Sequence, residues 1–586
     1  MYSKKYFFTI VVLLYGNYAI AQQEQKIAIN QLGFYPKAPK IAVVTQDVAA
    51  TSFQVINAET KLVVYDGALS ETKKSANSNL KTKQANLSAL QTPGTYIIRV
   101  SGLPDSYSFK IGHSVNHPAA AASLKGFYFI RSNTPLIEKY AGKWARPAGH
   151  PDTKVLVHAS AVSMERPEGT IISTPGGWYD AGDYNKYIVN SGISTSTLFS
   201  AYEDFPAYYD QLNTNIPESN NKVPDVLDEA VYNLRWMLTM QDPNDGGVYH
   251  KCTNAAFDAL NSKPGDTKLP RYVVQKGTSA TLNFAAVTAQ ASRVLRDFGD
   301  ALPGLADSCL GASEKAWQWA KLNPAVEYNQ RLMNTKFEPK ITTGDYGDGK
   351  LADEWFWAAS ELFVATKNIE YFADVKKGID KPYRLPAWNE VRMLGYYTLT
   401  RNSQVIPVGE KVLVDTLRNR IVKLADKFIS NVPTNAFATV MGQSKRDFIW
   451  GSSAVACNQG IVLINAYKLT GDKQYINYAL TNLDYILGRN ATGYSFLTGI
   501  GSKPVMHPHH RPSVADNVKD PVPGLLSGGP NPGMQDKVKY DFSEPETAFA
   551  DKKESYASNE IAINWNAPMA YLANAIEALQ AEITSK

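Results

Sequence analysis

The chain has 586 residues, of which 44% are hydrophobic and 20% are charged, proportions that are typical of a globular protein and exclude a disordered one. This length exceeds one ordinary core and predicts two or more domains, or one large domain with an accessory domain. The formal net charge is +5, but Lys and Arg are scattered without a basic run, which argues against a nucleic-acid-binding protein. The chain has three cysteines, Cys252, Cys309 and Cys457, and no CxxC pair, so we expect buried free thiols. One disulfide is an alternative, but the number of cysteines excludes a disulfide framework.

Residues 1–21 have the layout of a cleavable signal peptide. Lys4 and Lys5 precede an apolar run over residues 7–14, and Ala19-Ile20-Ala21 forms a small-residue cleavage site. The apolar run is too short to span a membrane, and no cysteine follows it as a lipid attachment point. The sequence predicts a soluble protein without a membrane anchor, cut after Ala21 and either secreted or periplasmic.

Residues 22–113 carry a β pattern. Short runs rich in Val, Ile, Tyr and Phe are separated by Pro, Gly, Asn and Ser, which predicts an immunoglobulin-like β-sandwich. The cysteine pair of antibody domains is absent, so the prediction rests on strand number and alternation. We interpret the domain as a supporting module that packs on its neighbour, with carbohydrate binding as the alternative.

Residues 118–586 carry an all-α pattern. Leu227, Val231, Leu234 and Leu238, for example, recur every three or four residues and therefore share one helix face. About a dozen helices joined by short turns favour a helical toroid or stacked helix pairs. Predicted helices lie at residues 120–132, 194–205, 225–241, 279–298, 312–322, 351–368, 388–402, 415–431, 458–472, 474–490 and 566–582. Three longer connections, at 160–177, 252–277 and 494–556, are of a length that is usually functional.

The first of three chemistry-bearing motifs is the loop at residues 176–184. Asp180 and Asp183 stand three residues apart among glycines, so their mutual repulsion should displace at least one pKa. Trp178 and Tyr179 offer flat apolar faces of the kind that stack on a sugar ring. A surface turn with an Asp cap is the alternative for an isolated pair of this kind.

The second motif contains three histidines, His507, His509 and His510, followed by Arg511. A metal site is one interpretation, but Pro508 and the close spacing fit poorly with several imidazoles converging on one ion. Hydrogen bonds from His and Arg to substrate hydroxyls and to a carboxylate are the better interpretation.

The third motif lies near the carboxyl end of the chain. Glu560 is predicted to open the final helix just after Asn559, with Asp551 and Tyr556 upstream. A glutamate in a first helical turn is ordinarily a surface residue that complements the helix dipole. Taken alone, the third motif therefore favours no function.

Together the three motifs resemble glycoside hydrolase family 9. Residues 176–192 resemble its nucleophilic-water loop, and residues 26–44 are similar to the start of the immunoglobulin-like domain that precedes many bacterial members. The resemblance covers nearly the whole mature chain. The family's histidine and acid signatures are matched by Ser495, Leu497, Thr498, Gly501, Lys503, Pro508, His509 and Arg511, and by Phe549, Asp551, Tyr556, Glu560, Ala562, Asn566 and Ala567.

The resemblance implies an (α/α)6 barrel that hydrolyses β-1,4-glucosidic bonds of cellulose-like β-glucans with inversion. Glu560 would be the acid, Asp183 the base, and Asp180 a second ligand for the attacking water. Inverting enzymes hold the acid and base roughly 6.5–9.5 Å apart. With Glu560 supplying the proton, both aspartates could stay ionised, whereas a helix N-terminus would favour ionised Glu560 unless burial or nearby acids raise its pKa.

The resemblance also implies roles for the flanking residues. His509 and Arg511 would hold substrate or orient carboxylates, and Asp551 and Tyr556 would line the same site. Trp178 and Tyr179 would stack on sugar rings.

Calcium is the metal that the resemblance suggests. Family members often bind it near a site resembling residues 344–354, where Asp353 and Glu354 supply oxygen ligands; a plain acidic helix start explains these two acids equally well. No cofactor is required, no zinc is expected, and we expect a monomer.

Two other functions stay open at this point. One is an exo-acting β-glycosidase on oligosaccharides, including amino sugars. The other is a non-catalytic glycan-binding protein on the same fold, against which the retention of three carboxylates argues. Whether the glucan is cellulose, mixed-linkage glucan or xyloglucan is equally open.

Overall fold

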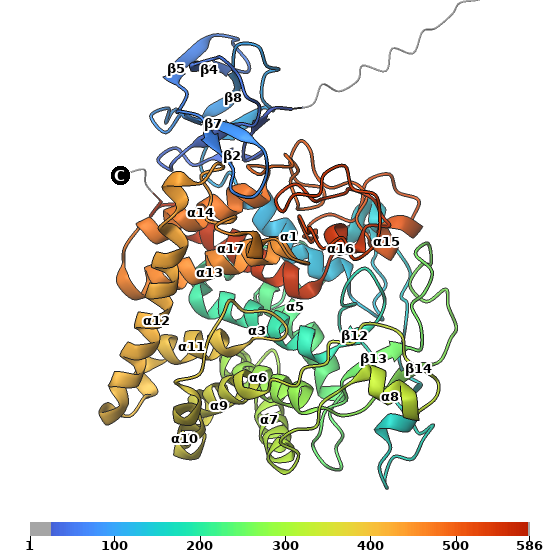
Figure 1. Cartoon of the computed structure of the whole chain (residues 1–586). Helices are drawn as coiled ribbons and strands as arrows, with labels where there is room; N and C mark the ends of the chain where they lie inside the picture. Colours follow the sequence, from blue (N-terminus) through green and yellow to red (C-terminus); the bar gives the residue numbers. More distant parts are fainter. Residues whose placement is uncertain (1–24, 584–586) are drawn as a thin grey trace, which may run out of the picture.

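The computed structural model describes residues 25–583, so the predicted signal peptide at 1–21 lies outside the described residues. A small β domain sits at one end of a larger helical domain (Figure 1). The last strand of the first domain ends at Ile111, and the first helix of the second begins at His117. No helix among the described residues combines the length and the apolar character needed to cross a membrane.

The N-terminal domain is a sandwich of two sheets, as predicted. Within residues 25–583 the sheets have the strand orders β1-β3-β7-β6 and β2-β9-β8-β4-β5. Side chains such as Phe34, Val55, Ile98 and Phe109 are buried between them because alternate residues of a strand face the same side. The strands are β1 (Ile27–Ala28), β2 (Gly33–Phe34), β3 (Ile41–Val44), β4 (Ser52–Asn57), β5 (Val63–Ala68), β6 (Lys73–Lys74), β7 (Lys81–Asn86), β8 (Gly94–Arg99) and β9 (Phe109–Ile111).

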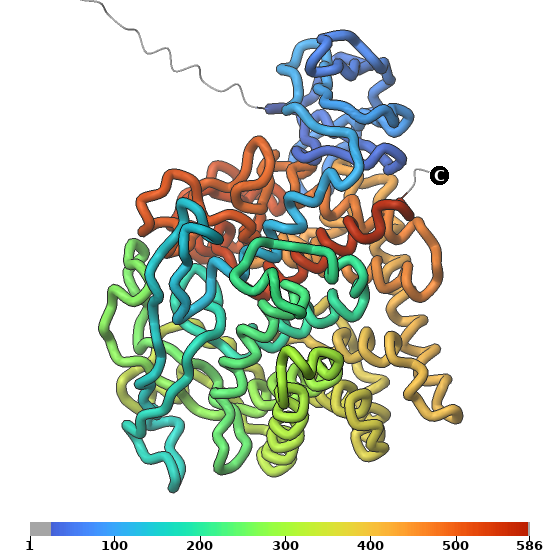
Figure 2. Tube along the Cα trace, turned by 180° about the vertical axis from the view of Figure 1, so that it is seen from behind, coloured from blue at the N-terminus to red at the C-terminus, as the bar shows by residue number. Residues whose placement is uncertain are grey.

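The sandwich packs firmly against the helical domain. Tyr35 donates to Glu577 at 2.5 Å, and the Asn30 amide donates to Asp484 at 2.8 Å. Val43 and Phe437 belong to one apolar cluster that spans the two domains. The sandwich covers the carboxyl-terminal helices of the barrel, as both views show (Figures 1 and 2). These contacts are those expected of a supporting module.

The helical domain alternates between outer and inner helices along the chain. Each inner helix packs against the outer helix paired with it and against neighbouring helices of the ring, which confirms the predicted (α/α)6 barrel. Within residues 25–583 the six inner helices are α3 (Ile188–Asp204), α6 (Thr278–Val294), α9 (Ala352–Thr366), α11 (Arg392–Arg401), α13 (Ser452–Thr470) and α17 (Ile563–Ala578). The outer ones are α1 (His117–Phe129), α5 (Asp225–Thr239), α7 (Leu305–Leu322), α10 (Ile369–Gly378), α12 (Lys411–Ile429) and α14 (Gln474–Ile486).

The two rings differ in sequence because they differ in burial. Helix α6 is buried nearly all round and is built from Ala, Thr, Ser and a few large apolar residues. Helix α12 instead buries one stripe, with Leu413, Leu417 and Ile421 recurring every four residues, and exposes charged residues elsewhere. The eleven helices predicted from periodicity are present. Helix α10 was not predicted as a separate helix. Only a short turn at Lys367 and Asn368 separates it from α9.

The alternation makes the inner helices run in the same direction, so their N-terminal ends meet at one end of the barrel. The longest loops and a small sheet of order β11-β10-β14-β13-β12 lie in this region. Its strands are β10 (Val155–Val157), β11 (Ile171–Ile172), β12 (Lys186–Tyr187), β13 (Lys251–Asn254) and β14 (Arg271–Val273). Short helices complete the chain: α2 (Glu138–Ala141), α4 (Pro206–Tyr209), α8 (Gln330–Lys336), α15 (Arg511–Ala515) and α16 (Tyr556–Asn559).

Candidate active site

The three motifs meet and are joined by backbone hydrogen bonds. The N–H of Ile563 donates to the carbonyl of Asp180 at 2.8 Å, and the N–H of Arg511 donates to that of Gly182 at 3.0 Å. The N–H of His509 donates to Asn559 at 2.9 Å. Segments separated by more than 300 residues in sequence therefore form one rigid unit.

Gly182 is required for this close approach. A Cβ atom at this position would lie 2.1 Å from the carbonyl oxygen of His509, which is less than any van der Waals contact allows. The glycine of the first motif thus serves to bring the backbone of the second motif against it.

Glu560 lies outside the final helix, so the prediction that it opens that helix is wrong. Helix α16 ends at Asn559 and α17 begins at Ile563; Glu560 between them is extended and forms a β-bridge with His509. Burial, and then the charges of Asp183 and Asp180, raise the pKa of Glu560 well above its usual value. The carboxyl group is therefore held in the protonated form that a general acid needs.

Asp180 is almost fully buried. Its Oδ1 accepts a hydrogen bond from Asn190 at 2.8 Å, whereas its buried Oδ2 has no hydrogen-bond partner within residues 25–583. Burial and then the charge of Asp183 raise the pKa of Asp180 to about 8. Both aspartates could stay ionised by the resemblance, but in the substrate-free protein burial favours a proton on Asp180 near neutral pH.

Asp183 is buried in the same loop but is better supplied with positive charge and donors. Burial raises its pKa, while the charge of Arg511 and hydrogen bonds from Asn185 oppose that rise. The backbone N–H of Asn185 donates to Oδ1 at 2.6 Å. Of the two aspartates, Asp183 is therefore the one with local support for its ionised form.

Asp183 and Glu560 line a common cavity of about 890 Å³. The loops that form it come directly before inner helices α3, α9, α11, α13 and α17, which explains why it lies at the end where these helices begin. Aromatic side chains on its walls and acids between them are the combination that binds a sugar chain. Its lining includes Ala181, Asp183, Phe257, Tyr346, Trp388, Ile449, Trp450, His509, Arg511, Tyr556, Glu560 and Trp565.

Trp178 and Tyr179 do not line this cavity, and the prediction that they stack on sugar rings is wrong. Trp178 has no exposed surface and packs on Phe127, with ring centroids 4.5 Å apart. The hydroxyl of Tyr179 is hydrogen-bonded to His150 at 2.9 Å. Both rings point into the protein and pack beneath the loop that carries Asp180 and Asp183.

The aromatic surface comes instead from residues that the sequence analysis did not single out. Trp450 is 41% exposed and Phe257 46% exposed, and both line the cavity. Burial, then the charges of Asp180, Glu560 and Asp183, raise the pKa of Tyr346, which places its hydroxyl among the three acids. Trp388 lies in the turn Pro386-Ala387-Trp388-Asn389 just before α11, a position that could have pointed to it.

His509, Arg511 and Tyr556 all reach the cavity, as expected. His509 donates through Nδ1 to the carbonyl of Lys553 at 2.6 Å, which leaves Nε2 as an acceptor, and burial lowers its pKa. Arg511 donates through Nη1 to Gly182 at 2.8 Å and through Nε to Asp258 at 3.0 Å. Two of its donors therefore hold protein loops. Tyr556 lies beside Trp450, with ring centroids 5.5 Å apart.

Asp551 does not line the cavity, so that prediction is wrong. Its carboxylate accepts from the backbone N–H groups of His507, at 2.8 Å, and Met506, at 3.0 Å, and from the Asn559 amide at 3.2 Å. Asp551 therefore fastens the histidine loop to the residue that precedes Glu560.

The three histidines of the second motif do not converge. The ring of His510 is buried against Ser513, at 2.9 Å, while His509 faces the cavity. Among the residues that the structure describes, no group of three or more His, Cys, Asp and Glu side chains is arranged to hold a metal ion. The geometry contradicts the interpretation of this loop as a metal site.

Comparison with known proteins now decides the family. Residues 117–573 match the model of glycosyl hydrolase family 9, and residues 22–104 match that of the cellulase N-terminal immunoglobulin-like domain. The chain is a family 9 glycosyl hydrolase. A xyloglucan-specific endo-β-1,4-glucanase of Bacteroides ovatus is 47% identical over 554 residues, covering 94% of each chain. Endoglucanase D of Acetivibrio thermocellus is 30% identical over 94% of this chain and 83% of its own.

Solved structures agree with this assignment of the family 9 enzyme. A Bacteroides ovatus family 9 structure superimposes with a TM-score of 0.90 at 46% identity, over 94% of this chain and 99% of the other. A single mutant of a thermostable endoglucanase from Alicyclobacillus acidocaldarius gives 0.83 at 28% identity, over 94% and 100%. The family assignment therefore covers both domains.

The acids suggested for calcium lie at the start of α9. Glu354 is fully buried, and neither of its carboxylate oxygens has a hydrogen-bond partner among the described residues; the same holds for Oδ2 of Asp348. Asp353 accepts from the backbone N–H of Val391 at 2.8 Å. These carboxylates alone cannot supply the six to eight oxygen ligands that calcium takes. Backbone carbonyl and water oxygens can supply the rest, so carboxylates without a hydrogen-bond partner are suitable ligands for calcium.

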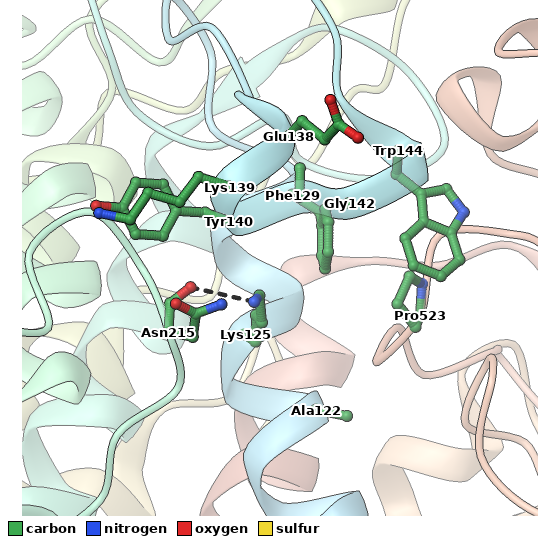
Figure 3. A pocket seen from close by; sticks show the side chains of 11 residues that line it. Ala122, Lys125, Phe129, Glu138, Lys139, Tyr140, Gly142, Trp144, Asn215 and Pro523 are labelled. Carbon is green, nitrogen blue, oxygen red and sulfur yellow. Dashed lines mark hydrogen bonds between the residues drawn. The ribbon is translucent and has the colours of Figure 1, made fainter.

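A second cavity, of about 360 Å³, lies beside α1 and α2 and contains none of the motif residues (Figure 3). Lys139 lies 4.7 Å from the ring centre of Tyr140, and Lys143 lies 4.8 Å from that of Trp144. Because lysines already cover these rings, this cavity offers a sugar little free aromatic surface. The enzyme's chemistry therefore belongs to the larger cavity.

Proposed function

We propose that the chain is an inverting endo-β-1,4-glucanase with xyloglucan as its leading substrate. The observation that carries the proposal is the common cavity of Glu560 and Asp183, in which the pKa of Glu560 is raised by burial and by both aspartates. A protonated acid and a carboxylate on one cavity are the two groups that inverting hydrolysis needs.

The reaction follows from these groups. Glu560 gives its proton to the glycosidic oxygen as the bond from the anomeric carbon to that oxygen breaks. A water attacks the anomeric carbon from the opposite face and transfers a proton to Asp183, which inverts the configuration. Oδ2 of Asp180 accepts a hydrogen bond from the same water when it is ionised. The cycle closes when Asp183 loses its proton and Glu560 regains one.

Xyloglucan is favoured by two observations. The Bacteroides ovatus relative described above is named for this substrate. In addition, the cavity carries apolar residues that are more than a third exposed: Phe257 at 46%, Ile449 at 48% and Trp450 at 41%. Such side chains can contact the branches of a substituted glucan as well as its backbone.

The test is hydrolysis of xyloglucan, carboxymethylcellulose, mixed-linkage glucan and cello-oligosaccharides by the wild type, Asp183→Ala and Glu560→Gln. We expect a rapid fall in xyloglucan viscosity, products that first appear as the α-anomer, and a loss of at least about 100-fold in each variant. Release of small sugars from chain ends alone would indicate an exo-acting glycosidase. Binding without new reducing ends would indicate a glycan-binding protein.

We also propose a structural calcium ion at Asp353 and Glu354, with backbone carbonyl and water oxygens completing its coordination. Calcium would offset the repulsion that, after burial, raises the pKa of Glu354 through Asp353 and Asp348. Calcium should then raise Tm by several degrees in the wild type but not in Glu354→Gln, with magnesium as the control. Equal Tm values with and without calcium would contradict the site.

Export is the remaining proposal, because a polymeric substrate is reached outside the cytoplasm. We expect a monomer whose N-terminus is Gln22 in the periplasm or medium, as read by mass spectrometry and size-exclusion chromatography. A mature protein that retains Met1 would contradict cleavage.

A further inference from the structure

Asn185 contacts both catalytic aspartates. Its backbone N–H and its side-chain Nδ2 both donate to Oδ1 of Asp183, at 2.6 and 3.0 Å. Its carbonyl accepts from the N–H of Asp180 at 3.0 Å. Only 2% of its surface is exposed. One residue therefore links the backbone of one acid to the carboxylate of the other.

The orientation of the Asn185 amide is fixed from behind. Its Oδ1 accepts from the hydroxyl of Thr253 and from the backbone N–H of Asn254, each at 3.0 Å. A backbone N–H can only donate, so the amide oxygen must point at β13 and the NH₂ group must point at Asp183. Strand β13 in turn pairs with β12, which follows Asn185 directly, with Lys186 opposite Cys252.

The result is an asymmetric carboxylate. Oδ1 of Asp183 holds two hydrogen bonds, both from Asn185. Oδ2 has no hydrogen bond from any described residue, and the side chain lines the cavity. Only Oδ2 is then available to take a proton from a water, and the fixed Oδ1 prevents the carboxylate from rotating away.

We propose that Asn185 is a positioning residue that holds Asp183 so that Oδ2 alone faces the attacking water. This role rests on the proposed function, in which Asp183 is the base. A purely structural turn is the competing explanation, because Asp and Asn side chains often bond to the backbone two residues on. The side-chain amide distinguishes the two, since a turn needs only the backbone hydrogen bond.

The test uses Asn185→Ala and Asn185→Asp in the full chain, with soluble xyloglucan as substrate. Asn185→Ala removes the second donor, and we expect kcat to fall about 10-fold or more with KM nearly unchanged. The acid limb of the kcat/KM profile should move to higher pH, because a carboxylate that loses a donor holds its proton more tightly. Asn185→Asp keeps the acceptor for β13 but adds a like charge, so its acid limb should move further.

Two companions make the result specific. Thr253→Val removes one of the two donors that orient the amide, so a smaller fall in kcat in the same direction is expected. Asn213→Ala is the matched control: Asn213 is exposed, accepts from the N–H two residues on at 2.8 Å and lies outside the cavity lining, so its kinetics should equal the wild type. Melting temperatures are measured for all four variants.

Unchanged kcat and acid limb in both Asn185 variants, beside an active wild type, would overturn the role of Asn185 and leave the proposed function standing. A lowered Tm with a wild-type pH profile would likewise overturn the role of Asn185, because that is the result expected of a residue that only stabilises the loop. A wild type inactive on every β-glucan tested would overturn the proposed function, and the role of Asn185 with it.

Discussion

Both ends of the barrel contain buried acids, but the pKa values of these acids are shifted in opposite directions. Where the inner helices begin, Asp180, Asp183 and Glu560 are buried close together, and burial raises the pKa of each; the charges of neighbouring acids add to the rise for Asp180 and Glu560. Where α3, α6, α11 and α13 end, a second group of charges lies in the interior. This group, the closed-end cluster, consists of Glu203, Asp204, Arg293, Arg401 and Lys468.

In the closed-end cluster each acid has a cation. Arg401 bonds Asp204 at 2.8 Å and Glu203 at 3.1 Å. Burial acts to raise the pKa of Asp204, but the charges of Arg401 and Lys468 outweigh it and lower that pKa to about 2. The cations also stand near the carboxyl ends of their helices, where the helix dipole favours positive charge. Burial is common to both ends, so the difference in pKa comes from pairing with cations. The paired acids of the closed-end cluster stabilise the fold, whereas the acids at the other end can exchange protons.

The largest effect that tests this comparison is on stability. Arg401→Leu removes the main partner of buried Asp204 and one of the two arginines that bond Glu203, and we expect the free energy of unfolding to fall by about 3–5 kcal/mol. Asp183→Asn, at the end where the inner helices begin, should leave the free energy of unfolding unchanged or raise it, while activity is lost. Denaturant unfolding of both variants makes the measurement. Equal destabilisation by the two substitutions would remove the distinction between the ends.

The pH dependence of stability should also differ between the ends. Asp204 has a lowered pKa of about 2, so its contribution is present above the unfolded value near 4 and is lost as pH falls toward 2. Asp180 has a raised pKa of about 8, so its contribution is complete below the unfolded value and is lost as pH rises through 8.

Asp180→Asn should therefore gain several degrees of Tm over the wild type at pH 9 and little at pH 5, as thermal melts across this range can show. A constant difference in Tm would contradict the raised pKa.

The smallest effect concerns the aromatic rim. Trp450→Ala removes an exposed cavity wall, and we expect KM for xyloglucan to rise about 5- to 10-fold, equivalent to roughly 1 kcal/mol of stacking, with little change in Tm. Trp178→Ala, which empties a buried site, should instead cost about 3–5 kcal/mol of stability. Steady-state kinetics and denaturant unfolding separate the two. A KM effect confined to Trp178 would restore it as a sugar platform.

The sequence predicted the parts of the molecule whose information is local. Amphipathic periodicity in α12 and the apolar runs of the sandwich depend on neighbours within a few residues, and both were predicted. The motifs likewise singled out Asp180, Asp183 and Glu560, which the structure brings close together. The exposure of Trp178 and Trp450 was not, because both are aromatic residues next to glycine in loops, and only their packing partners distinguish them.

The loop of Glu560 shows the same limit. Its spacing suited a first helical turn, but His509 and Gly528 form backbone contacts with it that hold the residue extended. Those partners lie 51 and 32 residues away in sequence, beyond the reach of any local pattern.

The sequence by itself determined which chemical groups this protein carries: three carboxylates, the glycine that lets two loops touch, and helices with the periodicity of a barrel. The tertiary structure decided what those groups can do. A pKa depends on burial and on charges brought from elsewhere in the chain, so only the assembled barrel gives Asp180 and Glu560 raised pKa values and gives Asp204 a lowered one.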